Sequence, residues 1–273
     1  MNHPPLASLY RTAFVTGAST GLGRAFADML LAEGVEVWGT SRDPARLPTR
    51  ERFHALALDL ADGARLEAVL AEADSAAGGF DLVINNAGYG IFGAFAGTEF
   101  AVWQAQIEAM LINTARLTHA ALRRQLARNH GAIVNLSSLA AEFPLPYQSA
   151  YNMAKSGLSA LNESLMVEVA GTGVIILDFR PGDYRTDFES SVRRPPGELT
   201  PRMERVWAAF ARMMRSGPPP VHAAASLRRA LLARRSGTVR TGRFSQVVVA
   251  PLLARFGTLS LRRTVQARYF DAT

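Results

Sequence analysis

The chain has 273 residues, 48% hydrophobic and 19% charged, which is enough apolar material for a packed core and excludes bulk disorder. No apolar run is long enough to span a membrane, and the first ten residues lack the basic start and apolar stretch of a signal peptide. The absence of cysteine excludes disulfides, thiolate metal sites and cysteine nucleophiles. We therefore expect a soluble cytoplasmic protein of one α/β domain, without a metal site.

The net charge of +7 is unevenly distributed along the chain. Residues 1–179 contain 12 basic and 17 acidic residues, whereas residues 180–273 contain 18 basic and 6 acidic residues. The Arg residues of the second part alternate with Pro and apolar residues and lack regularly spaced aromatic side chains, which is typical of a solvated basic face. We expect no nucleic-acid partner. Of the 30 basic residues 29 are Arg, and Lys155 is the single lysine.

Short apolar runs alternate with longer segments of helical period as far as Phe179. The expected strands are Thr12–Thr16, Val35–Gly39, Ala55–Leu58, Asp81–Asn85, Gly131–Leu136 and Val174–Phe179. The expected helices are Arg24–Ala32, Arg65–Ala73, Glu99–Arg128 and Ala150–Ala170. This alternation predicts a doubly wound (Rossmann) parallel sheet with helices on both faces, in a single domain over residues 1–273 with a core at 10–186.

The alternation ends after Arg180. Residues 187–220 are rich in Pro and Gly around one expected helix, Pro201–Met214, and this composition predicts a flap over the substrate. Residues 243–273 form a C-terminal tail in which Arg alternates with apolar side chains. We expect the tail to pack over the cleft or on a neighbouring subunit. Binding of the tail to a membrane surface is an open but less favoured alternative, because Pro251 and Gly257 interrupt its apolar stripe.

The first chemical motif is the run Thr16-Gly-Ala-Ser-Thr-Gly-Leu-Gly23, which follows an expected strand and precedes an expected helix. Glycines permit a tight turn and a close approach of the backbone to a pyrophosphate. The free N–H groups at the start of the helix favour phosphate. The motif therefore predicts a nucleotide-binding turn.

Further motifs lie at the ends of later strands or on neighbouring helices. They are Asn85-Asn86-Ala87-Gly88, Asn113, Ser137-Ser138, Tyr151-Asn-Met-Ala-Lys155 and Arg180-Pro181-Gly182. Together with the Gly-rich turn, this set resembles the classical short-chain dehydrogenase/reductase family over residues 12–186. In a doubly wound sheet the carboxyl ends of the strands form the ligand crevice, where these motifs would meet.

Tyr151 and Lys155 are four residues apart, so a helix places them on one face. A free tyrosine has a pKa near 10, and a nearby ammonium group should lower the pKa of Tyr151 toward neutrality. The resemblance implies that Tyr151 is the general acid/base, that Lys155 tunes it and binds the cofactor ribose, and that Ser138 holds the substrate oxygen. It also implies that Asn113 keeps a water beside Lys155.

The second strand indicates which nicotinamide cofactor is bound. Ser41 stands where family members that prefer NAD(H) carry an acid, and Arg42 follows it; a hydroxyl and a guanidinium suit a 2′-phosphate. We therefore expect NADP(H) rather than NAD(H). The resemblance implies a cofactor site formed by Gly17, Ser19, Thr20, Gly21, Leu22, Gly23, Ser41, Arg42, Asp59, Leu60, Asn86, Ala87, Gly88, Tyr151, Lys155, Pro181, Gly182 and Thr186.

The residues expected around the substrate are mostly apolar or aromatic. They are Tyr89, Phe92, Ser138, Phe143, Tyr147 and Tyr184. This lining favours a lipophilic ketone or aldehyde and its alcohol. The long tail is similar to that of the steroid- and retinol-dehydrogenase-like branch of the family. The alternatives are a 3-oxoacyl-thioester reductase and a non-catalytic NADP-binding protein. We expect a homodimer or homotetramer.

Overall fold

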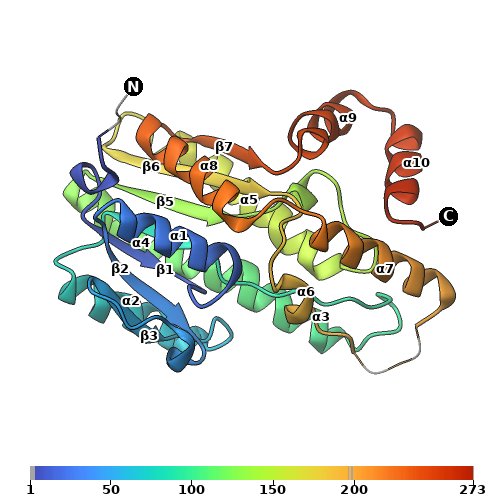
Figure 1. Ribbon diagram of the computed structural model, residues 1–273, viewed down its shortest axis with the longest axis horizontal. Helices are drawn as coiled ribbons and strands as arrows, with labels where there is room; N and C mark the ends of the chain where they lie inside the picture. The colour runs from blue at the N-terminus through green and yellow to red at the C-terminus, as the bar shows by residue number, and fades with distance from the viewer. Residues whose placement is uncertain (1–3, 196, 198, 273) are drawn as a thin grey trace.

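The strands form one sheet of seven parallel strands in the order β3-β2-β1-β4-β5-β6-β7 (Figure 1). The computed structural model describes residues 4–195, 197 and 199–272; residues 1–3, 196, 198 and 273, which belong to the expected domain ends, flap and tail, lie outside the described residues. The strands are β1 (Thr12–Val15), β2 (Glu36–Ser41), β3 (Phe53–Ala57), β4 (Leu82–Asn85), β5 (Gly131–Leu136), β6 (Val174–Pro181) and β7 (Gly237–Thr241). The doubly wound fold is confirmed. The chain order reverses between β1 and β4, which places the ligand crevice at their carboxyl ends.

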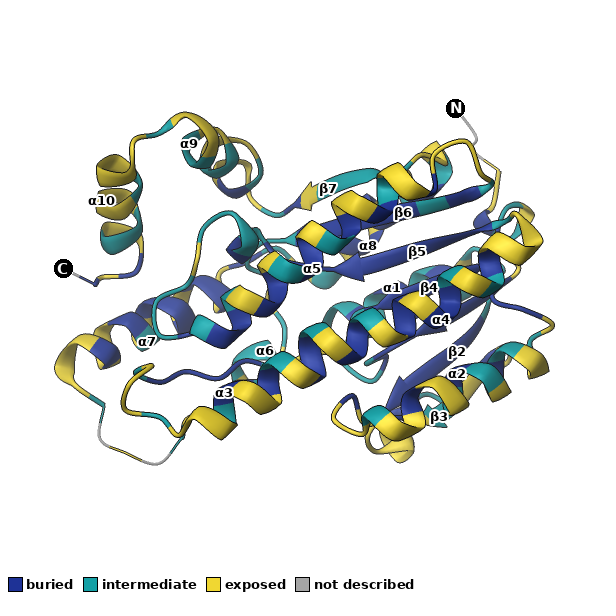
Figure 2. Ribbon diagram, turned by 180° about the vertical axis from the view of Figure 1, so that it is seen from behind, coloured by how far each residue is buried: buried dark blue, intermediate teal, exposed yellow. Residues whose placement is uncertain are grey.

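Helices cover both faces of the sheet, and each face buries its own apolar cluster (Figure 2). On one face lie α1 (Gly21–Ala32) and α8 (Pro220–Ala233), which bury side chains such as Phe26 and Leu227. The other face is covered by α2 (Gly63–Ala76), α4 (Asn113–Arg128) and α5 (Ser149–Glu168). The central strands β1, β4 and β5 are buried along their whole length, which explains their continuous apolar runs.

The segment expected as one helix over Glu99–Arg128 is helical from Phe100 to Arg128, but it is not α-helical throughout. It contains α3 (Phe100–Ile107), a π-helical turn (Glu108–Ile112) and then α4. The N–H of Asn113 donates to the carbonyl of Glu108, one residue further back than in an α-helix. Such a turn inserts one extra residue and changes the direction of the side chains that follow it.

Apart from α8 and β7, the helical segments after β6 form a layer beside the carboxyl ends of the strands. They comprise α6 (Phe188–Ser191), α7 (Pro201–Arg215), a π-helical turn (Ser245–Val249), α9 (Ala250–Phe256) and α10 (Leu259–Tyr269). The chain runs from β7 through α9 and α10 back toward α7 (Figure 1). Phe270 is buried there in a cluster with Phe210 of α7. None of the helices in the described part of the chain is long and apolar enough to cross a membrane.

Candidate active site

A cavity of about 1060 Å³ opens at the carboxyl ends of the strands. It brings together most of the residues expected from the sequence. These are Gly17, Ser19, Thr20, Gly21, Leu22, Ser41, Arg42, Asp59, Leu60, Asn86, Ala87, Gly88, Tyr89, Ser138, Phe143, Tyr151, Lys155, Pro181, Gly182, Tyr184 and Thr186. Gly23, Phe92, Asn113 and Tyr147 are not among its lining residues.

The Gly-rich turn has a shape that only glycine permits. Gly17 and Gly21 have positive φ angles of 68° and 56°. A Cβ on Gly17 would also approach the Cα of Ala87 to 3.0 Å, and a Cβ on Gly23 would lie 2.2 Å from the carbonyl oxygen of Gly17. Gly23 therefore does not line the cavity; its missing side chain allows α1 to pack closely against the turn. The open cradle and the start of α1 fit the pyrophosphate of a dinucleotide.

Asn86 fixes the turn to the end of β4. Its side-chain amide donates to the carbonyl oxygens of Thr16, at 2.9 Å, and Gly17, at 3.2 Å. In return, the hydroxyl of Thr16 accepts from the backbone N–H groups of Asn86 and Ala87. The two motifs follow neighbouring strands, β1 and β4, and these bonds join them into one unit.

The far end of the cavity carries the residues expected to select the cofactor. Strand β2 ends at Ser41, whose Oγ accepts from the backbone N–H of Asp43 at 3.2 Å. Arg42 and Arg46 both line the cavity. Sequence reasoning missed Arg46, although its spacing of four residues from Arg42 was a usable signal. The carboxylate of Asp43 accepts from the N–H of Ala45 and so caps the short 3₁₀ turn that carries Arg46.

The side chains that the sequence predicts to be catalytic lie on α5 and at the end of β5. Tyr151 and Lys155 are both buried, with the Lys155 Nζ 5.7 Å from the centre of the Tyr151 ring. Nζ donates to the carbonyl oxygen of Leu136 at 2.5 Å. The Oγ of Ser138 accepts from the N–H of Ala140 at 3.0 Å and thereby begins the turn after β5.

The pKa of Tyr151 is shifted in the opposite direction to the one expected from the sequence. Burial raises the pKa of Tyr151 to about 12, a hydrogen bond with Ser138 lowers it, and the charge of Asp183 raises it. The expectation that Lys155 would lower this pKa was wrong for the protein alone, because loss of hydration at the phenol dominates. Burial also lowers the pKa of Lys155 to about 8, against the opposing effect of Asp178.

Asn113 is buried but turned toward a different loop. Its side-chain Nδ2 donates to the carbonyl oxygen of Leu60 at 2.9 Å, and its Oδ1 has no partner among the described residues. The π-helical turn before Asn113 sets this direction. The side-chain amide therefore supports the loop that carries Asp59 and Leu60 into the cavity, and the expectation that Asn113 keeps a water beside Lys155 stays a prediction.

Three of the aromatic residues expected at the substrate have structural contacts instead. The Tyr184 hydroxyl, although its residue lines the cavity, is hydrogen-bonded to Thr241 Oγ1 and His222 Nδ1 at 2.7 and 2.8 Å. Phe92 packs on Tyr147, with ring centres 5.5 Å apart, and on Trp207 of α7. Phe92 and Tyr147 were wrong as substrate-lining residues, because they form the support on which α7 packs.

The sequence predicted that the tail packs over the cleft or on a neighbouring subunit, but it did not identify the tail residues that line the cavity. Gln246, Val249, Leu253, Val265, Gln266 and Tyr269 of the tail line it, together with Phe210 and Met214 of α7. The carboxylate of Asp183 accepts from the Gln246 amide at 2.5 Å and from the Tyr269 hydroxyl at 3.0 Å. These contacts join residues that are 63 and 86 positions apart, so no local pattern in the sequence could reveal them.

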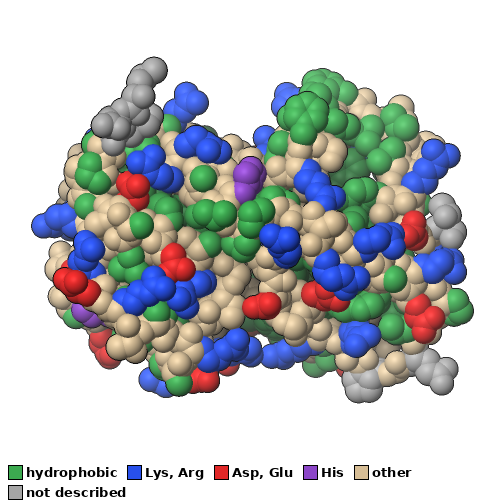
Figure 3. Space-filling model, viewed as in Figure 1, with side chains coloured by type: hydrophobic (Ala, Val, Ile, Leu, Met, Phe, Trp, Pro, Cys, Tyr) green, Lys and Arg blue, Asp and Glu red, His purple; other side chains and the backbone are tan. Residues whose placement is uncertain are grey.

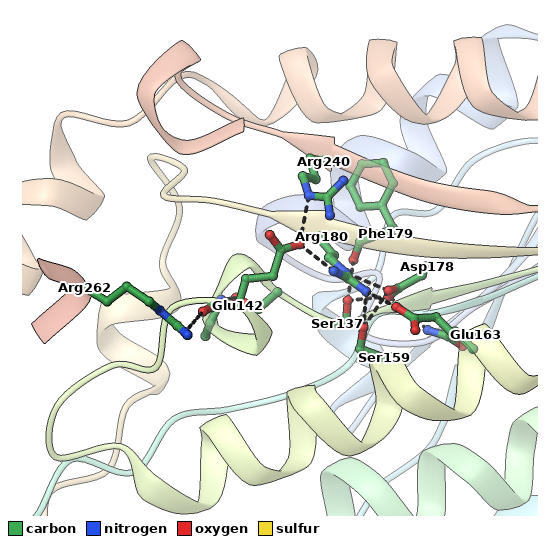
Figure 4. Close-up of polar contacts among 12 residues, drawn as sticks. Ser137, Glu142, Ser159, Glu163, Asp178, Phe179, Arg180, Arg240 and Arg262 are labelled. Carbon is green, nitrogen blue, oxygen red and sulfur yellow. Dashed lines mark hydrogen bonds and ion pairs between the residues drawn. The ribbon is translucent and has the colours of Figure 1, made fainter. Parts of the chain in front are cut away.

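A buried network of charges joins the turn after Ser138 to β6, β7 and the tail (Figure 4). The guanidinium of Arg180 donates to Asp178, Glu142 and Glu163 at 2.7, 2.5 and 2.9 Å. Glu142 also accepts from Arg240 at 2.8 Å. The backbone carbonyl of Glu142 accepts from Arg262 of α10.

The same network reaches Ser137, the residue before Ser138. The hydroxyl of Ser137 donates to Asp178 at 2.5 Å. The network therefore holds both ends of the segment from Ser137 to Glu142, which contains Ser138. In the sequence, Arg180 was recognised only as the residue before Pro181-Gly182.

Comparisons with known proteins identify the family of the chain. The family model for short chain dehydrogenases matches residues 11–197. The chain is 33% identical to Oxidoreductase BOA17 of Botryotinia fuckeliana over 208 residues, or 74% of this chain and 76% of that protein. It is 31% identical to the 3-ketodihydrosphingosine reductase of Bacteroides thetaiotaomicron over 202 residues, 74% of this chain and 73% of that protein.

Among solved structures, a short-chain dehydrogenase from Streptomyces avermitilis has a TM-score of 0.80 at 29% identity, covering 96% of this chain and 98% of that one. The chain therefore belongs to the short chain dehydrogenase family, whose members are oxidoreductases that act on CH–OH and C=O groups with a nicotinamide cofactor. The similarity of the tail to the steroid- and retinol-dehydrogenase-like branch stays a prediction.

Proposed function

We propose that the protein is an NADP(H)-dependent oxidoreductase that interconverts a lipophilic ketone or aldehyde and the corresponding alcohol. The observation that carries the proposal is that Ser138, Tyr151 and Lys155 meet in one cavity with the Gly-rich turn. A non-catalytic nucleotide-binding protein would have no need of this group. The burial of a lone lysine beside a buried tyrosine is unfavourable for stability, which favours a chemical role for both.

In the reduction direction Tyr151 donates the proton. Because burial raises the pKa of Tyr151 to about 12, the phenol is protonated at neutral pH and can give its proton to the substrate oxygen. Ser138 holds that oxygen through its hydroxyl. The reduced nicotinamide, when bound, supplies the hydride that the carbonyl carbon accepts. Hydride and proton together account for the two hydrogens of the alcohol, and in the oxidation direction Tyr151 takes the proton back.

Lys155 supports the transfer by its charge. Its pKa of about 8 keeps the ammonium group mostly protonated at pH 7, and its bond to the carbonyl of Leu136 fixes its position. As Tyr151 loses its proton, negative charge develops on the phenol oxygen, and a positive charge held nearby stabilises it. An arginine is larger and never gives up its charge, so it would not replace Lys155 here.

The preference for NADP(H) rests on Arg42 and Arg46. Both line the cavity beside Ser41, where an acidic residue would repel a 2′-phosphate. Neither guanidinium forms an ion pair with a described residue, so both are available to a phosphate group. A charge-assisted bond of this kind contributes about 1.5–3 kcal/mol.

The lipophilic substrate is supported by the inner half of the cavity. Its lining there is apolar and comes from the turn after β5, from α6 and α7, and from the tail. The residues are Leu139, Phe143, Leu145, Phe188, Phe210, Met214, Val249, Leu253, Val265 and Phe270. A polar sugar would lose its hydration on this surface without replacement.

A panel of carbonyl compounds tests the proposed function. The purified protein is mixed with NADPH and, in separate assays, aromatic ketones, medium-chain ketones, steroids, retinoids and acyl thioesters, and loss of absorbance at 340 nm is followed. We expect turnover of one or more lipophilic ketones and a weaker reaction with NADH. Preference for acyl thioesters would replace the ketone proposal by a 3-oxoacyl-thioester reductase, and no oxidation of NADPH with any compound would contradict both.

A further inference from the structure

Asp183 places a carboxylate in the wall of the cavity, beside the polar side chains of Gln246 and Tyr269 and the apolar lining of α7 and the tail. It follows Pro181-Gly182 directly and lines the same cavity as Tyr151. Its charge is close enough to raise the pKa of Tyr151. The carboxylate therefore lies near the place where the carbonyl or alcohol carbon of a substrate must be.

Among the described residues no cation forms an ion pair with this carboxylate, although the charge of Arg243 acts on it and lowers its pKa. Both of its hydrogen bonds reach Oδ2 and come from neutral groups, the amide of Gln246 and the hydroxyl of Tyr269. No ion pair within the described part of the chain joins Asp183 to an arginine or to Lys155. By contrast, Glu142 and Asp178, the acidic residues of the neighbouring network, each contact at least one guanidinium.

A largely desolvated carboxylate without an ion pair is unfavourable, and burial raises the pKa of Asp183 against the lowering effects of Tyr269, Gln246 and the charge of Arg243. A positively charged ligand group would relieve this penalty. Gln246 and Tyr269 orient the carboxylate on one side, which leaves Oδ1 without a described hydrogen-bond donor. The surrounding apolar lining suits the chain of such a ligand.

We propose that Asp183 selects a substrate with a positively charged amino group close to the reacting carbon, on a lipophilic chain. This inference rests on the proposed function and names its substrate class as amino ketones and the corresponding amino alcohols. The ammonium group pairs with Asp183, the oxygen binds Ser138 and Tyr151, and the chain extends over the apolar residues of α7 and the tail.

The test compares 1-aminooctan-2-ol with octan-2-ol, two alcohols that differ only in the amino group. Formation of NADPH from NADP+ gives kcat/KM for each compound. We expect the wild-type protein to favour the amino alcohol by about 10- to 100-fold, the range of one charge-assisted bond. Asp183→Asn keeps an oxygen acceptor for Gln246 and Tyr269 but removes the charge, so this ratio should fall to within about threefold of unity.

Tyr269→Phe is the matched control, because it removes one hydrogen bond of Asp183 and keeps the charge. We expect its preference for the amino alcohol to persist. A wild-type protein that oxidises both alcohols equally, or an Asp183→Asn variant that keeps the wild-type ratio, would overturn the inference and leave the proposed function in place.

Two measurements separate this inference from the proposed function. If the wild-type protein oxidises neither alcohol, its unfolding temperature in the presence of NADP+ is measured after addition of octylamine and, separately, of octan-1-ol. Stabilisation by octylamine alone, absent in Asp183→Asn, supports the cation site, and equal effects contradict it. If Asp183→Asn does not fold, inhibition of the wild-type protein decides: octylamine should inhibit octan-2-ol oxidation at least tenfold more strongly than octan-1-ol, and equal inhibition refutes the inference.

Discussion

Replacing Lys155 by methionine should abolish turnover. Relative to the wild type, the variant should gain more stability at pH 7 than at pH 9.5. The side chain is buried, and burial lowers the pKa of its ammonium group from 10.5 to about 8. The unfolded chain therefore binds this proton more tightly than the folded protein does. For a base whose folded pKa is lowered, stability rises with pH between the folded and the unfolded pKa.

The two pKa values set the magnitude. With a folded pKa of about 8 and an unfolded pKa of 10.5, the charge on Lys155 destabilises the folded state by about 3 kcal/mol at pH 7 and by about 1 kcal/mol at pH 9.5. Methionine fills a similar volume without a charge. It also leaves the carbonyl of Leu136 without its donor, but that penalty does not depend on pH.

Urea unfolding of both proteins at pH 7 and pH 9.5 isolates the charge. The free energy of unfolding of Lys155→Met minus that of the wild type should fall by about 2 kcal/mol between the two pH values. All groups that titrate alike in the two proteins cancel in this difference. A difference that is the same at both pH values would refute the account of Lys155 as a desolvated cation.

Three further substitutions test other parts of the site. Arg42→Ala should weaken NADPH binding about tenfold and leave NADH binding unchanged, because only NADPH has a 2′-phosphate; fluorescence titration of both cofactors measures this. Gly23→Ala should destabilise the protein by about 1–3 kcal/mol in urea unfolding and weaken cofactor binding, since its Cβ would lie 2.2 Å from a backbone oxygen. Glu142→Gln should lower the free energy of unfolding by about 2 kcal/mol and reduce turnover, because Arg180 and Arg240 lose a buried carboxylate.

Two of these variants have a matched control in the chain, and Arg42→Ala is controlled by its binding of NADH. A Cβ on Gly237 would meet nothing within 4 Å, so Gly237→Ala should leave the free energy of unfolding almost unchanged. Glu163 pairs with the same Arg180 but its side chain is 64% exposed, so Glu163→Gln should change stability by less than about 1 kcal/mol. Equal effects of Glu142→Gln and Glu163→Gln would contradict the positioning role of the buried network, and equal losses of both cofactors in Arg42→Ala would contradict the phosphate contact.

The parts of the site that depend on local sequence were predictable. Alternating strands and helices placed the Gly-rich turn, Asn86 and Ser138 at the carboxyl ends of parallel strands, where they meet in one cavity. The spacing of Tyr151 and Lys155 placed both on one face of α5. These inferences needed only the period of each element and the topology that follows from it.

The parts that depend on distant contacts were not predictable. Asp183 acquires its environment from Gln246 and Tyr269 in the tail, whose place is set by the packing of Phe270 on α7. The direction in which the pKa of Tyr151 is shifted depends on how completely the folded chain excludes water, which the spacing of Tyr151 and Lys155 does not reveal.

The tail has apolar side chains that face solvent and others that line the cavity, and the sequence did not distinguish the two groups. Hydrophobic side chains gather on the surface of the tail around α9 (Figure 3). Leu252 and Phe256 of α9 are exposed, as is Phe244 just before the π-helical turn. Val249 and Leu253 of the same segment line the cavity. An apolar stripe predicts a contact, but only the fold shows which of its side chains face the body of the protein.

The most direct test of the central claim compares the wild-type protein with Tyr151→Phe, using the best ketone of the panel. The variant lacks only the hydroxyl that donates the proton. We expect it to bind NADPH within about threefold of the wild-type affinity, while kcat falls by about 10²- to 10⁴-fold, the usual contribution of general acid catalysis. A variant that turns over at the wild-type rate would show that another group supplies the proton, and would contradict the role assigned to Tyr151.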